Sequence, residues 1–227
     1  MLQLQSSQFI LPKDSSSGDD ACAFTIIDNA MLVSVLCDGV GSAKRGGTAA
    51  RQCVKFFIDQ FKTRPKAWDV PKTMEVFTRH INSLLFKESM TQYGQIELLT
   101  TLCLAIIQGE TLYTLNLGDS RIYLLTSKGE LLRLSTDHTM DDEYLSHVLT
   151  QACGLSDNIE PLITTTPISV GDTLILCSDG VYNVINESTF THLIQKGLGA
   201  STIINHAAQN GSLENRDDMS LQIFHVE

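Results

Sequence analysis

The sequence predicts one α+β domain that covers residues 1–227. Strands joined by short turns gather in separate stretches of the chain, and helices come in pairs between them, which is the pattern of an α+β fold. The mass of 25.0 kDa suits one sizeable domain. A hydrophobic fraction of 43% is enough for a core, and no internal repeat, low-complexity tract or linker divides the chain.

The N-terminal part predicts three strands. An edge strand runs through Phe9–Leu11 and stops at Pro12, because proline has no N–H to donate to a sheet. Ala21–Ile27 and Met31–Cys37 flank a turn at Asp28-Asn29 and predict a hairpin.

Two helices are predicted next. Apolar side chains near a 3.6-residue period predict a first helix that Thr48 caps at its N-terminus and that ends before Thr63–Pro71. A second helix spans Lys72–Met90 and ends at Gly94.

The remaining chain is mostly β, with helices near its end. Hairpin turns at Gly109-Glu110 and Ser127–Gly129 separate predicted strands. The strands expected here are Leu98–Ile107, Thr111–Leu117, Arg121–Thr126, Glu130–Leu134, Leu162–Thr165, Asp172–Cys177 and Met219–Val226. The helices expected here are Asp141–Ala152, Glu187–Lys196 and Ala200–Asn210.

Composition excludes several classes of protein. A net charge of −10 and a pI near 5.0 disfavour nucleic acid or an anionic membrane as the main partner. The first residues lack the pattern of a signal peptide, and no apolar run approaches the ~20 residues of a spanning helix. None of the cysteines forms a C-x-x-C pair, which argues against zinc, and most lie in apolar runs. We therefore expect reduced core cysteines and a cytoplasmic location.

Asp38 is the first candidate for a metal ligand. It ends the apolar run Met31–Cys37, and Gly39 and Gly41 follow it. A carboxylate there is costly to desolvate unless a positive group meets it, and hard cations prefer oxygen ligands. This pattern indicates Mg²⁺ or Mn²⁺ on Asp38 and a neighbouring carbonyl, although an ordinary Asp-Gly turn fits it too.

The same pattern recurs later in the chain. Asp179 also ends an apolar strand and precedes glycine, Asp119 follows Gly118, and the pair Asp217-Asp218 precedes the last strand. A fold that brings these carboxylates together would build a dinuclear site with oxygen ligands. Four unrelated Asp turns are the alternative interpretation.

Two further motifs have both a functional and an ordinary interpretation. Lys44 and Arg45 precede two glycines at a helix N-terminus, which can hold an anion or can be a solvated basic loop. Asp137-His138 invites a catalytic role, but adjacent residues on a loop do not form a dyad by themselves.

Seven short motifs follow in order along the chain: Gly18-Asp19-Asp20-Ala21, Asp38-Gly39-Val40-Gly41, Gly118-Asp119-Ser120-Arg121, Asp137-His138, Val148-Leu149-Thr150 before Gly154, Ser178-Asp179-Gly180, and Asp217-Asp218-Met219-Ser220. In this order they resemble the metal-dependent serine/threonine phosphatase family called PP2C or PPM. Ser42-Ala43 stands in place of the family's second glycine and histidine, and in this the chain resembles the bacterial branch of the family. The resemblance implies a four-layer α-β-β-α sandwich of two antiparallel sheets flanked by helix pairs.

The resemblance also implies an activity: hydrolysis of phosphoserine and phosphothreonine in proteins at a centre of two Mn²⁺ or Mg²⁺ ions, with a metal-bridging hydroxide as nucleophile. Asp38 would bridge the ions, the Gly39 carbonyl would bind one, and Asp179 and Asp217 the other. Asp38, Asp179 and Asp217 are thus the residues expected to be catalytic.

Further roles follow from the same resemblance. Asp119 would bind a third ion, and Asp19 or Asp20 would act through a metal-bound water. The implied partners are a phosphoprotein substrate and a cognate Ser/Thr kinase, without nucleic acid or membrane, and the chain is expected to be a monomer.

The chain departs from the family pattern in two places. It lacks the arginine that often precedes the acidic pair, so Lys13, Lys44 and Arg45 are the candidates to bind the substrate phosphate. Val40 stands where eukaryotic members have a histidine that is proposed as the general acid. The alternative function is therefore a weak or inactive regulatory module on the same fold, and a metal-dependent nuclease is a third reading that the acidic charge disfavours.

Overall fold

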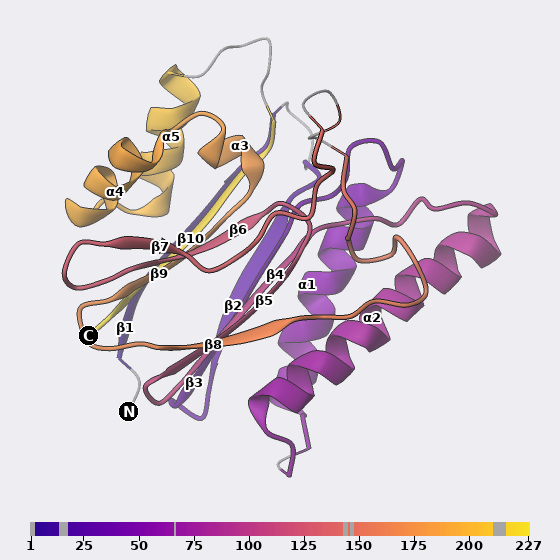
Figure 1. Cartoon of the computed structure of the whole chain (residues 1–227), viewed down its shortest axis with the longest axis horizontal. Helices are drawn as coiled ribbons and strands as arrows, with labels where there is room; N and C mark the ends of the chain where they lie inside the picture. Colours follow the sequence, from indigo (N-terminus) through magenta and orange to yellow (C-terminus); the bar gives the residue numbers. More distant parts are fainter. Residues whose placement is uncertain (1–2, 14–17, 66, 143–144, 146–147, 211–216) are drawn as a thin grey trace.

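The computed structural model describes residues 3–13, 18–65, 67–142, 145, 148–210 and 217–227. Two antiparallel sheets of five strands face each other, and helices cover both outer faces (Figure 1). This arrangement confirms the predicted four-layer sandwich.

The first sheet carries the N-terminal hairpin. Its strand order is β2-β3-β4-β5-β8. The strands are β2 (Ala21–Ile27), β3 (Met31–Cys37), β4 (Leu102–Gln108), β5 (Thr111–Leu117) and β8 (Ile163–Pro167). Two helices, α1 (Gly46–Lys62) and α2 (Val70–Tyr93), cover its outer face (Figure 1).

The second sheet joins the two ends of the chain. Its strand order is β1-β10-β9-β6-β7. The strands are β1 (Leu4–Leu11), β6 (Arg121–Leu125), β7 (Leu131–Arg133), β9 (Thr173–Cys177) and β10 (Met219–Val226). The short α3 (Asp179–Tyr182) and the helices α4 (Glu187–Gln195) and α5 (Ala200–Asn210) lie on its outer side (Figure 1).

Three apolar layers hold these elements together. Phe57 of α1 and Met74 of α2 pack on the first sheet, and Phe190 of α4 packs on the second. Leu36 and Phe224 are fully buried between the two sheets. Strands buried on both faces read as continuous apolar runs, which is why the sequence located β3 and β9 accurately.

The strands predicted over residues 98–134 divide between the sheets. β4 and β5 pair in the first sheet, whereas β6 and β7 pair in the second. The segment Gly118–Ser120 is therefore the crossover from one sheet to the other, and it carries Asp119 to the rim of the sandwich.

The helix starts differ from the sequence predictions. α1 begins at Gly46, so the prediction that Thr48 caps it was wrong; Arg45 is the N-cap residue and its side chain makes no capping bond. α2 begins before Pro71, because the Asp69 carboxylate caps it by accepting the Lys72 N–H at 2.8 Å. Proline in the first turn needs no N–H donor.

The helix predicted over Asp141–Ala152 was also wrong. In the described part of that range, backbone bonds cross a loop instead of following one helix. Met140 N–H donates to the Val148 carbonyl at 2.9 Å, and Thr139 bridges Leu149.

Two expectations from composition can be checked. The six cysteines are unpaired, and all except Cys22 are buried. Among the described helices, none is long and apolar enough to cross a membrane.

Candidate metal centre

The predicted carboxylates meet at one end of the sandwich. Antiparallel pairing puts the end of β3 beside the start of β2, and the end of β9 beside the start of β10. Asp38 and Asp20 are therefore neighbours on the first sheet, and Asp179 and Asp217 are neighbours on the second. Asp119, on the crossover between the sheets, completes the group.

Asp38 is held by its backbone. Its N–H donates to Thr101 Oγ1 at 2.9 Å, and its carbonyl accepts the Thr101 N–H at 2.8 Å. The Thr100 hydroxyl donates to the same carbonyl at 2.8 Å. The Thr101 and Ser120 hydroxyls lie 2.8 Å apart, so Thr101 also ties Asp38 to the crossover. No motif in the sequence pointed to Thr101.

Gly39 lies where no side chain fits. A Cβ there would come within 2.4 Å of the Gly46 carbonyl carbon and 2.7 Å of the Asp19 carbonyl oxygen. The Gly39 N–H donates to that oxygen at 3.2 Å. The start of α1, the turn after β3 and the acidic N-terminal pair are therefore packed backbone to backbone, as the glycine motif requires.

Mutual repulsion and burial dominate the electrostatics of this end. Desolvation, followed by the charges of Asp20, Asp179, Asp217 and Asp119, raises the pKa of Asp38 well above 3.8. The Asp38 side chain keeps some contact with solvent, yet it lies deep enough for desolvation to be the largest cause. These carboxylates lie close enough to interact although they come from distant parts of the sequence.

Asp20 and Asp179 carry buried oxygens without a hydrogen-bond partner. Both carboxylate oxygens of Asp20 and Oδ1 of Asp179 are in this state within the described structure. Burial raises the pKa of Asp20 to about 7, and burial with the charges of Asp119 and Asp217 raises that of Asp179 to about 6. Buried polar atoms are normally paired, so such atoms at a site call for a positive partner.

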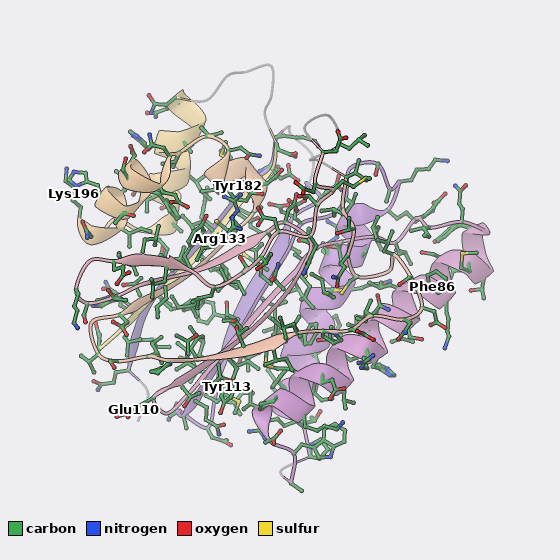
Figure 2. All side chains as sticks on the ribbon, in the orientation of Figure 1. Phe86, Glu110, Tyr113, Arg133, Tyr182 and Lys196 are labelled. Atoms are coloured by element: carbon green, nitrogen blue, oxygen red, sulfur yellow. The ribbon has the colours of Figure 1, made fainter. Side chains whose placement is uncertain are left out.

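Asp119 is positioned by a network that the sequence did not reveal. The Tyr182 hydroxyl donates to the Asp119 carbonyl at 3.1 Å, and the Arg121 guanidinium lies over the Tyr182 ring at 3.5 Å from its centroid. Arg121 donates to both oxygens of Asp137, with its shortest bond 2.7 Å long. Arg133 also donates to Asp137. Figure 2 shows that Arg133 and Tyr182 lie near each other, and that Glu110 lies at the opposite end of the sandwich.

The Asp137-His138 motif therefore supports the site from outside. Asp137 pairs with Arg121 and Arg133, and His138 Nδ1 accepts the Gly118 N–H at 3.2 Å. His138 N–H donates in turn to the Gly118 carbonyl at 2.9 Å. Both residues hold the crossover and neither joins the carboxylate group.

Asp217 and Asp218 have different surroundings. Asp217 is 55% exposed in its side chain and lies 3.5 Å from Lys13 Nζ. Asp218 is 2% exposed and accepts the backbone N–H groups of Lys13, Asp19 and Asp20. The buried residue of the pair anchors the N-terminal acidic segment, and the exposed one faces the carboxylate group.

Of the predicted phosphate-binding residues, Lys13 alone lies beside the carboxylates. Its pKa is raised by Asp217 above all. Lys44 and Arg45 both pair with Glu97, at 4.0 and 3.6 Å, and Arg45 lies over the Tyr93 ring. The basic loop is thus tied to the end of α2.

The carboxylate oxygens at this end of the sandwich are ligands of the chemical type that hard cations bind. In the part of the chain that the structure describes, no three His, Cys, Asp or Glu side chains are placed as a ready metal-binding group. The side chains that converge are nonetheless all oxygen donors, they repel one another, and several oxygens lack partners. Oxygen ligands and excess negative charge are what Mg²⁺ and Mn²⁺ require.

Comparison with known proteins identifies the family. The family model described as "Protein phosphatase 2C" matches residues 13–208. Serine/threonine phosphatase stp of Listeria monocytogenes is 26% identical over 195 residues, which cover 78% of this chain and 77% of that protein.

Solved structures have the same fold. Serine/threonine phosphatase Stp1 from Staphylococcus aureus superposes with a TM-score of 0.84 at 19% identity, over 100% of this chain and 96% of that one. The catalytic domain of the phosphatase PstP, solved in complex with two manganese ions, gives a TM-score of 0.79 at 21% identity, over 100% and 99% of the two chains. The chain belongs to the protein phosphatase 2C family and is a serine/threonine protein phosphatase of that family.

Proposed function

We propose that this chain hydrolyses phosphoserine and phosphothreonine in proteins with two Mn²⁺ or Mg²⁺ ions. Asp38, Gly39, Asp179 and Asp217 would hold the two ions, and Asp119 would bind a third. The observation that carries this proposal is the convergence of partnerless, buried carboxylate oxygens where five aspartates interact. The manganese in the PstP structure, which has the same fold, adds support.

The chain's own residues would position the reactants. When bound, two such cations neutralise phosphoryl charge and lower the pKa of a water that attacks phosphorus. The Thr100 and Thr101 hydroxyls hold the Asp38 backbone, and the crossover network holds Asp119. Asp19 or Asp20 would act through a metal-bound water.

Lys13 is the first candidate to bind the substrate phosphate. It lies beside the carboxylates and approaches from the N-terminal segment that Asp218 anchors. Lysine offers a point charge without the bidentate geometry of arginine. We further propose that the protein is cytoplasmic, because its six unpaired cysteines suit a reducing compartment. We also propose that it is a monomer and that it reverses the action of a Ser/Thr kinase.

The test is phosphatase activity with Mn²⁺, Mg²⁺ or EDTA, on p-nitrophenyl phosphate and a phosphothreonine peptide. Asp38→Asn should lose at least about 100-fold in metal-dependent kcat/KM, since even residues behind metal ligands contribute 10–100-fold. Asp28→Asn, at the far turn of the same hairpin, is the matched control and should retain activity.

Stability supplies an independent readout. Without metal, Asp38→Asn should unfold at a higher temperature than wild type, because it relieves repulsion within the carboxylate group. Added Mn²⁺ should raise the midpoint of wild type only. Metal binding without any turnover would instead support the weak or inactive regulatory module.

A further inference from the structure

A groove of about 420 Å³ opens beside the acidic centre. It is lined by Ile10, Asp20, Ala21, Cys22, Ala23, Arg51, Val54, Lys55, Ile58 and Asp59. β1 and β2 are the end strands of the two sheets, so the groove lies along the open edge of the sandwich. α1 runs alongside β2 (Figure 1). Its residues from Arg51 to Asp59 form the third wall of the groove.

The groove is continuous with the site described above. Asp20 lines it, and the two carboxylate oxygens of Asp20 have no hydrogen-bond partner in the described structure. The groove therefore begins beside a residue of the carboxylate group.

The walls suit an extended polypeptide. Ala23, Val54 and Ile58 give the groove apolar surface. β2 pairs with β3 on one side only, so its other edge presents backbone N–H and C=O groups. Extended peptides commonly add to such an edge, with their side chains in adjacent pockets.

Arg51 supplies the charge. Its Nη1 donates to the Gly18 carbonyl at 3.2 Å, which turns the guanidinium toward the acidic N-terminal segment. A Cβ on Gly47 would lie 3.1 Å from this Nη1 and 2.5 Å from Asp19 Oδ1, so the two groups are neighbours. Lys55 is paired with Asp59, whereas Arg51 makes no ion pair with any described residue. Its remaining N–H groups suit a carboxylate, which arginine binds in bidentate fashion.

We propose that the groove binds an extended segment of the phosphoprotein substrate, next to the phosphorylated residue, and that Arg51 selects an acidic side chain in this segment. The inference rests on the proposed phosphatase activity. It assigns to Arg51 and the edge of β2 a role in choosing the substrate, separate from the chemistry at the carboxylates.

The first experiment blocks the groove. For each variant, the ratio of kcat/KM on a Glu-flanked phosphothreonine peptide to kcat/KM on p-nitrophenyl phosphate is measured with Mn²⁺. Ala23→Arg should lower this ratio at least about tenfold, because a large side chain fills the groove and only the peptide needs it. Ile26→Arg, on an exposed part of the same strand outside the groove, is the control and should leave the ratio unchanged. Equal ratios in both variants would overturn the proposal.

The second experiment reverses the charge and does not depend on Ala23→Arg folding. Wild type should prefer Glu-flanked over Lys-flanked phosphopeptides, and Arg51→Glu should invert this preference. Arg51 is exposed, so its variant should fold. Lys62→Glu makes the same charge change on the last turn of α1 and should keep the wild-type preference. A preference that Arg51→Glu leaves unaltered would contradict the assignment.

A peptide-binding measurement distinguishes a wrong assignment of the groove from a lack of phosphatase activity. A fluorescent, non-hydrolysable analogue of the Glu-flanked peptide is titrated with Mn²⁺-loaded protein, and its anisotropy is followed. Binding that Arg51→Glu weakens, without turnover of any phosphate ester, would refute the phosphatase proposal and keep the groove. Turnover of p-nitrophenyl phosphate, together with peptide binding that is equal in all variants, would keep the phosphatase proposal and refute the groove.

Discussion

The Asp218 carboxylate joins the two ends of the chain: Oδ1 accepts the Lys13 backbone N–H at 2.7 Å, across 205 positions of sequence. Its other oxygen accepts the N–H groups of Asp19 and Asp20. The acidic pair before β2 is therefore placed by a residue just before β10. The β2–β3 pairing puts Asp20 beside Asp38, and this contact ties the backbone of Asp20 to the second sheet.

Asp218→Ala should destabilise the fold by about 1–3 kcal/mol, since it leaves buried backbone donors without an acceptor. Urea unfolding measures the change. Asp217→Asn is the matched neighbour: its exposed contact with Lys13 contributes about 0–1 kcal/mol. We expect the neighbour to lose metal-dependent activity while it keeps its stability. Equal stability losses in the two variants would contradict the anchoring role of Asp218.

Thr101→Val should weaken Mn²⁺ binding about tenfold or more, because its hydroxyl accepts the Asp38 N–H and contacts Ser120. Isothermal titration with Mn²⁺ measures this affinity. Thr114→Val removes another buried threonine hydroxyl of the same sheet, one that bonds Thr164. The control should lose stability only. If both variants bound Mn²⁺ like wild type, Thr101 would be a packing residue.

Asp137→Asn should lower the free energy of unfolding by about 1.5–3 kcal/mol, the range for hydrogen bonds to a charged group. It removes the carboxylate that holds Arg121 over Tyr182. Chemical denaturation gives the value. Asp59→Asn breaks the exposed pair with Lys55 and should cost much less, because solvent screens that pair. A loss as small as that of Asp59→Asn would mean that the network contributes little to the fold.

His138→Gln should flatten the pH dependence of stability below about pH 6.5. Burial lowers the pKa of His138 from 6.5, against the opposing charge of Asp137. Above 6.5 the ring is neutral in both states and its bond to the Gly118 N–H is intact. As the pH falls through 6.5, the unfolded chain takes up a proton that the folded chain resists, so wild type loses stability.

Thermal unfolding from about pH 7 to 5 in wild type and variant isolates this contribution, since the carboxylates titrate alike in both. His80→Gln, on the exposed face of α2, is the control and should follow wild type. A variant curve parallel to wild type would show that His138 does not resist protonation.

The sequence alone determined the elements whose signal is local. β3 is an apolar run, interrupted by Ser34, that is buried on both faces, and the prediction of Met31–Cys37 matches it residue for residue. α5 likewise begins and ends at the residues that its apolar period indicates. The ordered series of glycine and aspartate motifs was enough to indicate the family and the fold, because each aspartate of the carboxylate group lies within two residues of the end of a strand.

Only the tertiary structure decided which side chains support that site. Asp217 and Asp218 are adjacent residues of the same type. Asp217 faces the carboxylate group, whereas Asp218 is buried against the backbone of residues before β2. Residues 141–152 have no helix in their described part, because their backbone bonds run across a loop. Arg51 lies in a groove beside Asp20 because α1 packs along the edge of β2. Such contacts join positions far apart in the chain, and no pattern within one window of sequence can specify their geometry.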